Sequence, residues 1–202
     1  LTREIPIRVN IYQHVLTFNI HHIAFDGWST NLLLDEIAKL YHGEKLPLMN
    51  LQYKDFANWQ RKVQTNGTLK EQKDYWVKRL ADYEEVDFPT DFARPREFDY
   101  IGKEYTYNLD ANLITKLKEL AQRENTSLFS VTLSAFMILL SIYSNQKNVV
   151  VGTPIANRHI KGTEDLIGFF VNTLALNAKV DPELKINEFI SLNSEQVINA
   201  QK

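Results

Sequence analysis

The residues best suited to chemistry lie in the segment His21-His22-Ile-Ala-Phe-Asp26-Gly27, at the end of an apolar run. Imidazole and carboxylate groups are costly to bury there unless partners satisfy them. Neighbouring side chains on a strand point to opposite faces, so at most one of His21 and His22 faces a given cavity. The pattern therefore favours a single histidine acting as a general base, with Asp26 either orienting an imidazole or pairing with a distant cation.

A structural interpretation of the same segment stays open beside the catalytic one. Histidines at the end of a strand can be hydrogen-bonded core residues, and an aspartate before a glycine is typical of a turn. The other histidines, His14, His42 and His159, lack the spacing of metal ligands. The sequence contains no Gly-x-Ser-x-Gly elbow, no P-loop and no nicotinamide-binding fingerprint, so we expect neither a metal nor covalent serine catalysis.

The composition of the 202 residues excludes further classes of function. The chain has 23 Lys plus Arg against 25 Asp plus Glu, and this balance gives no reason to expect nucleic acid as a partner. It contains no cysteine, so it has no disulfide and no thiolate nucleophile. Serine and threonine interrupt the longest apolar stretch, 128–143, which predicts a buried helix and no membrane span. No signal peptide is recognisable at the N-terminus, and we expect a cytoplasmic protein.

Periodicity predicts strands that alternate with helices, which is an α/β layered fold. One strand is expected to run to Ile23, and Ser29 or Thr30 is expected to cap the helix that follows Gly27. Asp110 and Thr126 or Ser127 are expected to cap two later helices. The predicted strands are 7–12, 14–23, 104–108, 148–155 and 169–176; the predicted helices cover about 29–41, 53–66, 69–81, 111–123, 128–143 and 186–200; and 87–102 is expected to be a loop or linker.

Five segments, taken together, resemble the condensation domains of nonribosomal peptide synthetases, within the chloramphenicol-acetyltransferase-like group. The first segment looks like the family's His-His-x-x-x-Asp-Gly motif. The other four follow in the family's order: Tyr53-Lys-Asp55-Phe56-Ala57-Asn-Trp59, Phe88-Pro89-Thr90-Asp91 with Arg94-Pro95, Val151-Gly-Thr-Pro154-Ile-Ala-Asn-Arg158, and Ile167-Gly168-Phe169-Phe170-Val-Asn172-Thr173.

The resemblance implies a fold of two acetyltransferase-like lobes with the active site in a tunnel between them. By this resemblance, residues 1–65 are the C-terminal part of the first lobe and residues 66–202 the N-terminal part of the second, with the boundary between 45 and 85. The chain is expected to be a middle fragment of the domain, because the family's signatures before and after this region are not found in it.

The resemblance also implies the reaction and its partners. A donor carrier protein presents an acyl or peptidyl thioester, and an acceptor carrier protein presents an aminoacyl group whose amine attacks that thioester. The 4′-phosphopantetheine arms belong to the peptidyl carrier proteins, so the chain itself is expected to bind no cofactor. An adenylation domain is expected next to it in a multidomain synthetase.

Carried over by position, His22 is the residue at the reacting centre, as a base or as a partner that orients the amine. His21 supports it, and the Gly27 backbone approaches the thioester and donates to the oxyanion. Asp26 is expected to form a structural ion pair with Arg158 between the lobes. Candidates for lining the tunnel are Trp28, Ser29, Asn172 and Thr173, although Trp28 also suits the core.

Spacing favours core roles for Tyr53, Phe56 and Trp59, because they share one apolar helix face. Arg94 and Arg96 suit a solvated loop more than a phosphopantetheine contact. Two alternatives to condensation remain open. One is another His-x-x-x-Asp acyltransferase that uses acyl-CoA or a carrier thioester. The other is a noncatalytic module that docks carrier proteins, although such relatives typically lose the second histidine.

Overall fold

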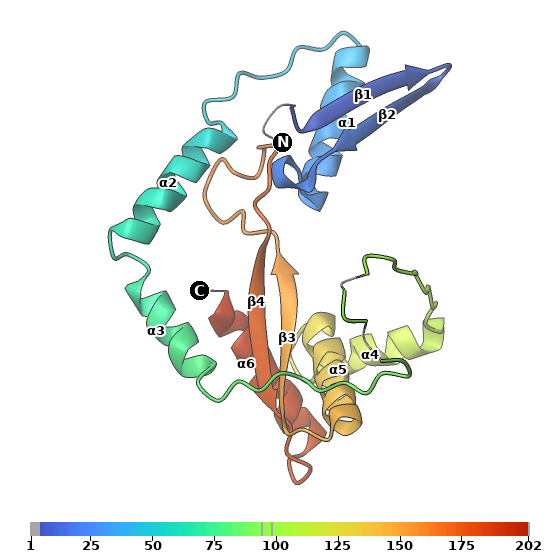
Figure 1. Cartoon of the computed structure of the whole chain (residues 1–202), viewed down its shortest axis with the longest axis vertical. Coiled ribbons are helices and arrows are strands. Elements are labelled where there is room, and N and C mark those ends of the chain that lie inside the picture. Colours follow the sequence, from blue (N-terminus) through green and yellow to red (C-terminus); the bar gives the residue numbers. More distant parts are fainter. Residues whose placement is uncertain (1–4, 94, 98, 202) are drawn as a thin grey trace. The chain divides into compact units, whose positions relative to one another are not determined.

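The computed structural model describes residues 5–93, 95–97 and 99–201, and Arg94 lies outside them. The chain divides into two compact units: the first comprises Leu1–Trp76 and Pro154–Thr173, and the second comprises Val77–Thr153 and Leu174–Lys202. Strands and helices both contribute to the chain, in agreement with the predicted α/β class. Figure 1 shows the elements along the chain.

The first unit begins with a hairpin of β1 (Ile7–Tyr12) and β2 (Val15–Ile20). The two strands are antiparallel, with Ile7 opposite Ile20 and Tyr12 opposite Val15. Gln13, in the two-residue turn, has the positive φ of 52° that such tight hairpins require. The predicted strand 7–12 is confirmed.

The second predicted strand ends three residues earlier than expected. β2 stops at Ile20, and His22–Ala24 forms a short 3₁₀ helix, η1. The cause is local: Nδ1 of His21 accepts a hydrogen bond from the backbone N–H of Ile23 at 3.1 Å, which turns the chain out of the extended form. The premise that both imidazoles are buried on a strand is wrong, because both side chains are exposed.

Two helices follow in the first unit, α1 (Gly27–Tyr41) and α2 (Tyr53–Thr65), and α3 (Lys70–Arg79) extends from it into the second unit. Asp26, rather than Ser29 or Thr30, caps α1. The predicted end of this helix at residue 41 is confirmed, and Gly43, directly after the C-cap His42, adopts a φ of +81°. The ends of α2 and α3 lie within two residues of the prediction.

The second unit contains α4 (Ala111–Arg123), α5 (Leu128–Ser144), most of β3 (Asn148–Ile155), most of β4 (Asn172–Lys179) and α6 (Ile186–Ala200). The last two residues of β3 and the first two of β4 belong to the first unit. Its core joins the three helices through Ala121, Val131 and Ile190. Asp110 and Ser127 cap α4 and α5 as predicted. The predicted strand 148–155 and helix 186–200 are confirmed.

Two predicted strands differ from the structure. Residues 104–108 form no strand, and Tyr105 and Tyr107 are exposed, because no partner strand in the described residues pairs with them. β4 begins at Asn172 instead of Phe169. The backbone groups of residues 168–170 bind side chains of α1 and α2, as described below, and are therefore not available to a neighbouring strand.

Helix α5 buries one face, including Ser130, Val131 and Met137, while Phe129 and Phe136 stay exposed. No single helix in the described part of the chain has the length and apolar character to cross a membrane, although α4 and α5, bent by 106°, pass that test as a pair.

Candidate active site

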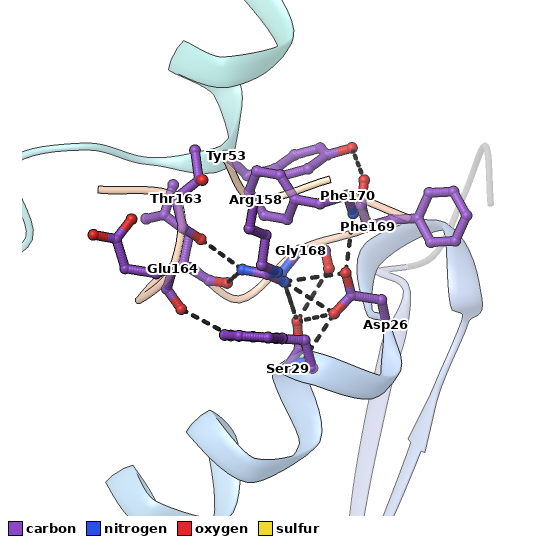
Figure 2. A network of polar contacts seen from close by, with 11 residues as sticks. Asp26, Ser29, Tyr53, Arg158, Thr163, Glu164, Gly168, Phe169 and Phe170 are labelled. Carbon is purple, nitrogen blue, oxygen red and sulfur yellow. Dashed lines mark hydrogen bonds and ion pairs between the residues drawn. The ribbon is translucent and has the colours of Figure 1, made fainter. Parts of the chain in front are cut away.

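Asp26 is the N-cap of α1 and the centre of a buried polar network (Figure 2). Its Oδ1 accepts the backbone N–H of Ser29 at 2.9 Å and the hydroxyl of Ser29 at 2.7 Å. Its Oδ2 accepts the backbone N–H of Phe170 at 3.1 Å. A carboxylate that satisfies a helix N-terminus and a distant backbone N–H fixes the start of α1 against the 168–170 segment.

Arg158 is the cation that pairs with Asp26. Its Nη2 lies 2.9 Å from Oδ1 and 3.1 Å from Oδ2 of Asp26, and the two side chains are 3% and 0% exposed. Nη1 donates to the carbonyl oxygens of Thr163 and Leu166, both at 2.6 Å. The guanidinium carbon lies 4.1 Å from the centroid of the Phe170 ring, a cation–π distance. The structure thus contains the ion pair that the resemblance implies, within its first unit.

Ser29 links the same network to Gly168. The Ser29 hydroxyl lies 3.1 Å from the Gly168 N–H, 3.0 Å from the Gly168 carbonyl oxygen and 3.1 Å from Nη2 of Arg158. Ser29 is completely buried. Contrary to the expectation of a tunnel-lining residue, its side chain serves the buried network rather than an open surface.

Burial by itself raises the pKa of Asp26, and this is the largest single effect on it. The hydrogen bonds from Ser29 and Phe170, together with the charge of Arg158, outweigh it, so the net pKa lies below the usual value. Asp26 is therefore an anion at neutral pH, and it is hydrogen-bonded and paired on both oxygens. Its position suits a structural role and leaves it no proton to donate.

Tyr53, at the start of α2, reaches the same segment from the other side. Its hydroxyl donates to the carbonyl oxygen of Phe169 at 2.7 Å. Burial, followed by the charge of Asp26, raises the pKa of Tyr53, so the phenol keeps its proton. Tyr53 and Ile160 pack against the core cluster of Phe56, Leu166 and Phe170. The core role predicted for Phe56 is confirmed, whereas Trp59 is 43% exposed and only stacks on Phe56.

Gly168 is the residue over which the Tyr53 ring lies. A Cβ at this position would stand 2.3 Å from Cδ2 and 2.9 Å from Cε2 of Tyr53. Real Cβ atoms do not make such contacts, so the ring and the backbone approach each other only because residue 168 has no side chain. The segments that contain Tyr53 and Gly168 both resemble family signatures, and the packing of the first requires the glycine of the second.

The two histidines lie at the start of η1, immediately before the network in the sequence. His21 is the N-cap of η1 and its Nδ1 accepts the Ile23 N–H, so it holds the local backbone. His22 is exposed, and its ring meets the ring of Phe169 edge to face with 5.3 Å between centroids. Of the pair, His22 is the imidazole whose ring nitrogens have no hydrogen bond within the described residues.

Gly27 is the first residue of α1, and a Cβ there would meet nothing within 4 Å. Packing in the described residues therefore does not require a glycine at this position. Trp28 is half exposed rather than in the core, and its indole N–H donates to the carbonyl oxygen of Glu164 at 2.9 Å. Trp28 thereby ties α1 to the loop that also holds Arg158.

Asn172 and Thr173 lie at the start of β4, and both are exposed. The side-chain oxygen of Asn172 accepts the backbone N–H of Thr173 at 2.8 Å. Their exposure is compatible with lining a tunnel, and the backbone N–H that Asn172 satisfies is itself exposed. Arg96 is exposed, as expected for a loop residue.

Sequence reasoning named Ser29 as a cap or tunnel-lining residue but missed its part in the buried network, and it assigned no role to the Phe169 ring. A serine three residues after an aspartate that can cap a helix is a recognisable signal for the first, because the cap carboxylate accepts the N–H and the hydroxyl of that serine. Phe169 stands in an apolar run between Gly168 and Phe170 and carries no local signal, because its importance depends on contact with a residue 147 positions away.

Comparisons with known proteins agree on the family. The family model described as "Condensation domain" matches residues 1–202. The chain is 39% identical to tyrocidine synthase 2 of Brevibacillus parabrevis over 201 residues, which are 99% of this chain and 6% of that protein. It is 41% identical over 180 residues to gramicidin S synthase 2 of Aneurinibacillus migulanus, covering 89% of this chain and 4% of that protein.

Solved structures show the same fold. A four-domain nonribosomal peptide synthetase, crystallised in its holo form with AMP and glycine, matches with a TM-score of 0.86 and 26% identity over 97% of this chain and 15% of that one. The chain therefore spans a small part of these relatives. The match of the family model to every residue, together with these likenesses, places the chain in the condensation-domain family of the nonribosomal peptide synthetases.

Proposed function

We propose that the protein carrying this chain forms peptide bonds between a carrier-bound acyl or peptidyl thioester and a carrier-bound aminoacyl group. The observation that carries the proposal is the position of His22. Its ring is exposed directly before a helix start that Asp26, Ser29 and Arg158 fix by buried hydrogen bonds. A site held by rigid support and open on one side suits a reaction between two large partners.

In the proposed reaction the acceptor amine attacks the thioester carbonyl. A C–N bond forms, the C–S bond breaks, and the thiol of the donor's phosphopantetheine arm leaves with a proton. The amine loses one proton and the departing thiolate takes one up, so the step balances. His22 acts either as the base that accepts the amine proton or only as the hydrogen-bond partner that orients the amine. The phosphopantetheine arms are part of the two substrates, and the carrier proteins supply them.

Orientation is the larger contribution we assign to His22. The pKa of an α-amino group is about 8, so a useful fraction is already neutral and nucleophilic at pH 7. Proton removal then adds little, whereas fixing the amine against the carbonyl can supply roughly 7–11 kcal/mol in favourable cases. The His22 ring meets the Phe169 ring at 5.3 Å between centroids, and the His21 side chain holds the backbone turn that carries His22, which supports this role.

Gly27 is proposed to contribute through its backbone. It is exposed at the N-terminus of α1, where N–H groups lack intrahelical partners and attract negative charge. A developing oxyanion beside this turn would receive such an N–H. The open space around the Gly27 Cα supports a requirement set by the substrate rather than by packing.

The remaining assignments follow from the family and stay proposals for this protein. Donor and acceptor peptidyl carrier proteins are the partners, an adenylation domain is the neighbour, and the cytoplasm is the location. The tunnel between two lobes, with residues 1–65 in the first lobe and 66–202 in the second, is proposed on the same ground, as is the role of Trp28, Asn172 and Thr173 in lining it.

A comparison of two adjacent variants tests the function. In the full-length protein with two loaded carrier proteins, His22→Ala is expected to lose most of the turnover while remaining folded. His21→Ala is the matched control and is expected to act mainly through stability, since it removes the bond to the Ile23 N–H. The measurements are single-turnover formation of the condensed product by mass spectrometry and the thermal melt of each variant.

The outcomes separate the alternatives. Near wild-type turnover by a folded His22→Ala protein would refute the assignment of His22 to the reacting centre. Carrier binding by the unsubstituted protein without any product would favour a docking module instead. Product formed equally well from acyl-CoA would favour an acyltransferase with a soluble donor.

A further inference from the structure

The segment Gly168–Phe170 is held at each of its three residues by a side chain from another element. Ser29 binds the Gly168 N–H, Tyr53 binds the Phe169 carbonyl oxygen at 2.7 Å, and Asp26 binds the Phe170 N–H at 3.1 Å. Such dense support is unusual for a non-strand segment, because loops ordinarily satisfy their backbone with water.

This support fixes the direction of the Phe169 side chain. The Phe170 ring packs beneath Arg158, with 4.1 Å between its centroid and the guanidinium carbon. The neighbouring Phe169 ring points away from the Arg158 side chain, as Figure 2 shows. There it meets His22 edge to face, with 5.3 Å between ring centroids and 89° between ring planes. Phe169 is 36% exposed, so the contact with His22 leaves part of the residue accessible.

We infer that Phe169 is a positioning residue for the His22 imidazole. Tyr53 contributes by holding the backbone of Phe169 through its carbonyl oxygen. The imidazole of His22 has rotational freedom about its side-chain bonds, and no hydrogen bond in the described residues restricts it. An aromatic ring held by a fixed backbone and packed at right angles to the imidazole limits the orientations that the imidazole can adopt. This inference rests on the proposed function only where it concerns turnover, since the contact itself is independent of the reaction.

The contact is tested first without any substrate. Diethyl pyrocarbonate acylates neutral imidazoles, and tandem mass spectrometry of the full-length protein resolves His22 from His21. In Phe169→Ala the acylation rate at His22 is expected to rise severalfold, because one side of the ring loses its cover. The rate at His21 is expected to stay the same, since its Nδ1 is fixed by the Ile23 N–H. A parallel rise at both histidines would mean general loosening and would overturn the inference.

Turnover is tested second, with two loaded carrier proteins. Phe169→Ala is expected to lower kcat on the order of ten- to a hundredfold, as misplacement of a catalytic group does, with the KM for the carriers unchanged. Phe169→Tyr keeps the ring and is expected to restore both kcat and the slow acylation of His22. Phe92→Ala, at an exposed phenylalanine in the second unit, is the control and should change neither.

The two proposals fail in different ways. Unchanged acylation at His22 in Phe169→Ala would show that the contact does not restrict the imidazole, whatever the role of His22. A raised acylation rate with unchanged kcat would also reject positioning. Full turnover by His22→Ala would reject the proposed function and leave the contact standing.

Discussion

At the scale of the residue, the ion pair of Asp26 and Arg158 illustrates the difference between stabilising a fold and doing chemistry. Both side chains are almost fully buried, and a buried charge that loses its partner is strongly unfavourable. Every oxygen of Asp26 is engaged by Arg158 and by backbone or hydroxyl donors. Loss of activity on changing Asp26 is therefore no evidence that Asp26 takes part in catalysis.

Asp26→Ala is expected to lower the free energy of unfolding by about 3–5 kcal/mol, because it leaves the guanidinium of Arg158 buried and unpaired. Denaturant unfolding monitored by tryptophan fluorescence measures this. The matched control is Asp35→Ala on the same helix, whose pair with Lys39 is exposed and screened by solvent, so a much smaller change is expected. Equal effects of the two variants, with turnover lost only in Asp26→Ala, would contradict the structural role.

At the scale of the element, α2 and the 168–170 segment are matched to each other. The first turn of α2 presents Tyr53, whose ring covers Gly168 and whose hydroxyl holds Phe169. The segment gains these bonds at the expense of strand pairing, and so β4 begins only at Asn172. The helix N-terminus and a distant loop therefore form one structural feature.

Gly168→Ala is expected to destabilise the chain by about 1–3 kcal/mol, the usual cost of overpacking, because the new Cβ would overlap the Tyr53 ring. Gly102→Ala is the control, since a Cβ there meets nothing within 4 Å, and it should lie within about 0.5 kcal/mol of the wild type. Denaturation midpoints measure both. In a Tyr53→Ala background the cost of Gly168→Ala should shrink, and an undiminished cost would show that another contact is responsible.

At the scale of the whole molecule, the shifted pKa values predict how stability depends on pH. The pKa of Asp26 is lower in the folded chain than in the unfolded one, where it is about 3.9. The folded chain therefore binds this proton less tightly, and the associated stability is present above about pH 4 and lost as the pH falls through the folded value. The pKa of Tyr53 is raised, so its contribution is present below about pH 10 and lost as the pH rises further.

Unfolding measured between pH 3 and pH 11 is thus expected to show a loss of stability at both ends. Asp26→Asn should flatten the acid limb and Tyr53→Phe the alkaline limb, each without affecting the other. Glu164 also has a lowered pKa, caused by backbone hydrogen bonds of its own N–H and of Gly162, so Glu164→Gln is the control for the remaining acid slope. An acid limb unchanged in Asp26→Asn would refute the assignment of that slope to Asp26.

Much of the architecture was predictable from local pattern. The strands 7–12 and 148–155 and the helix 186–200 have the predicted limits, because clear periodicity and capping residues specify them. The strand predicted at 104–108 lacks a partner in the described residues, and periodicity alone does not report pairing. The end of β2 was misplaced because a histidine side chain binds the backbone two residues later, which hydrophobic pattern does not reveal.

The sequence by itself determined the family, because five ordered segments carry residue types whose combination is specific. It also indicated His22 as the reacting residue and Asp26 and Arg158 as an ion pair. Only the tertiary structure decided that Asp26 rather than Ser29 caps α1, that Ser29 is buried, and that Phe169 lies against His22. For Ser29 and Phe169 the physical reason is distance along the chain: their contacts join residues more than 130 positions apart, and short-range periodicity carries no information about them. For the cap the reason is that Asp26 and Ser29 are both good capping residues only three positions apart, and local pattern does not choose between them.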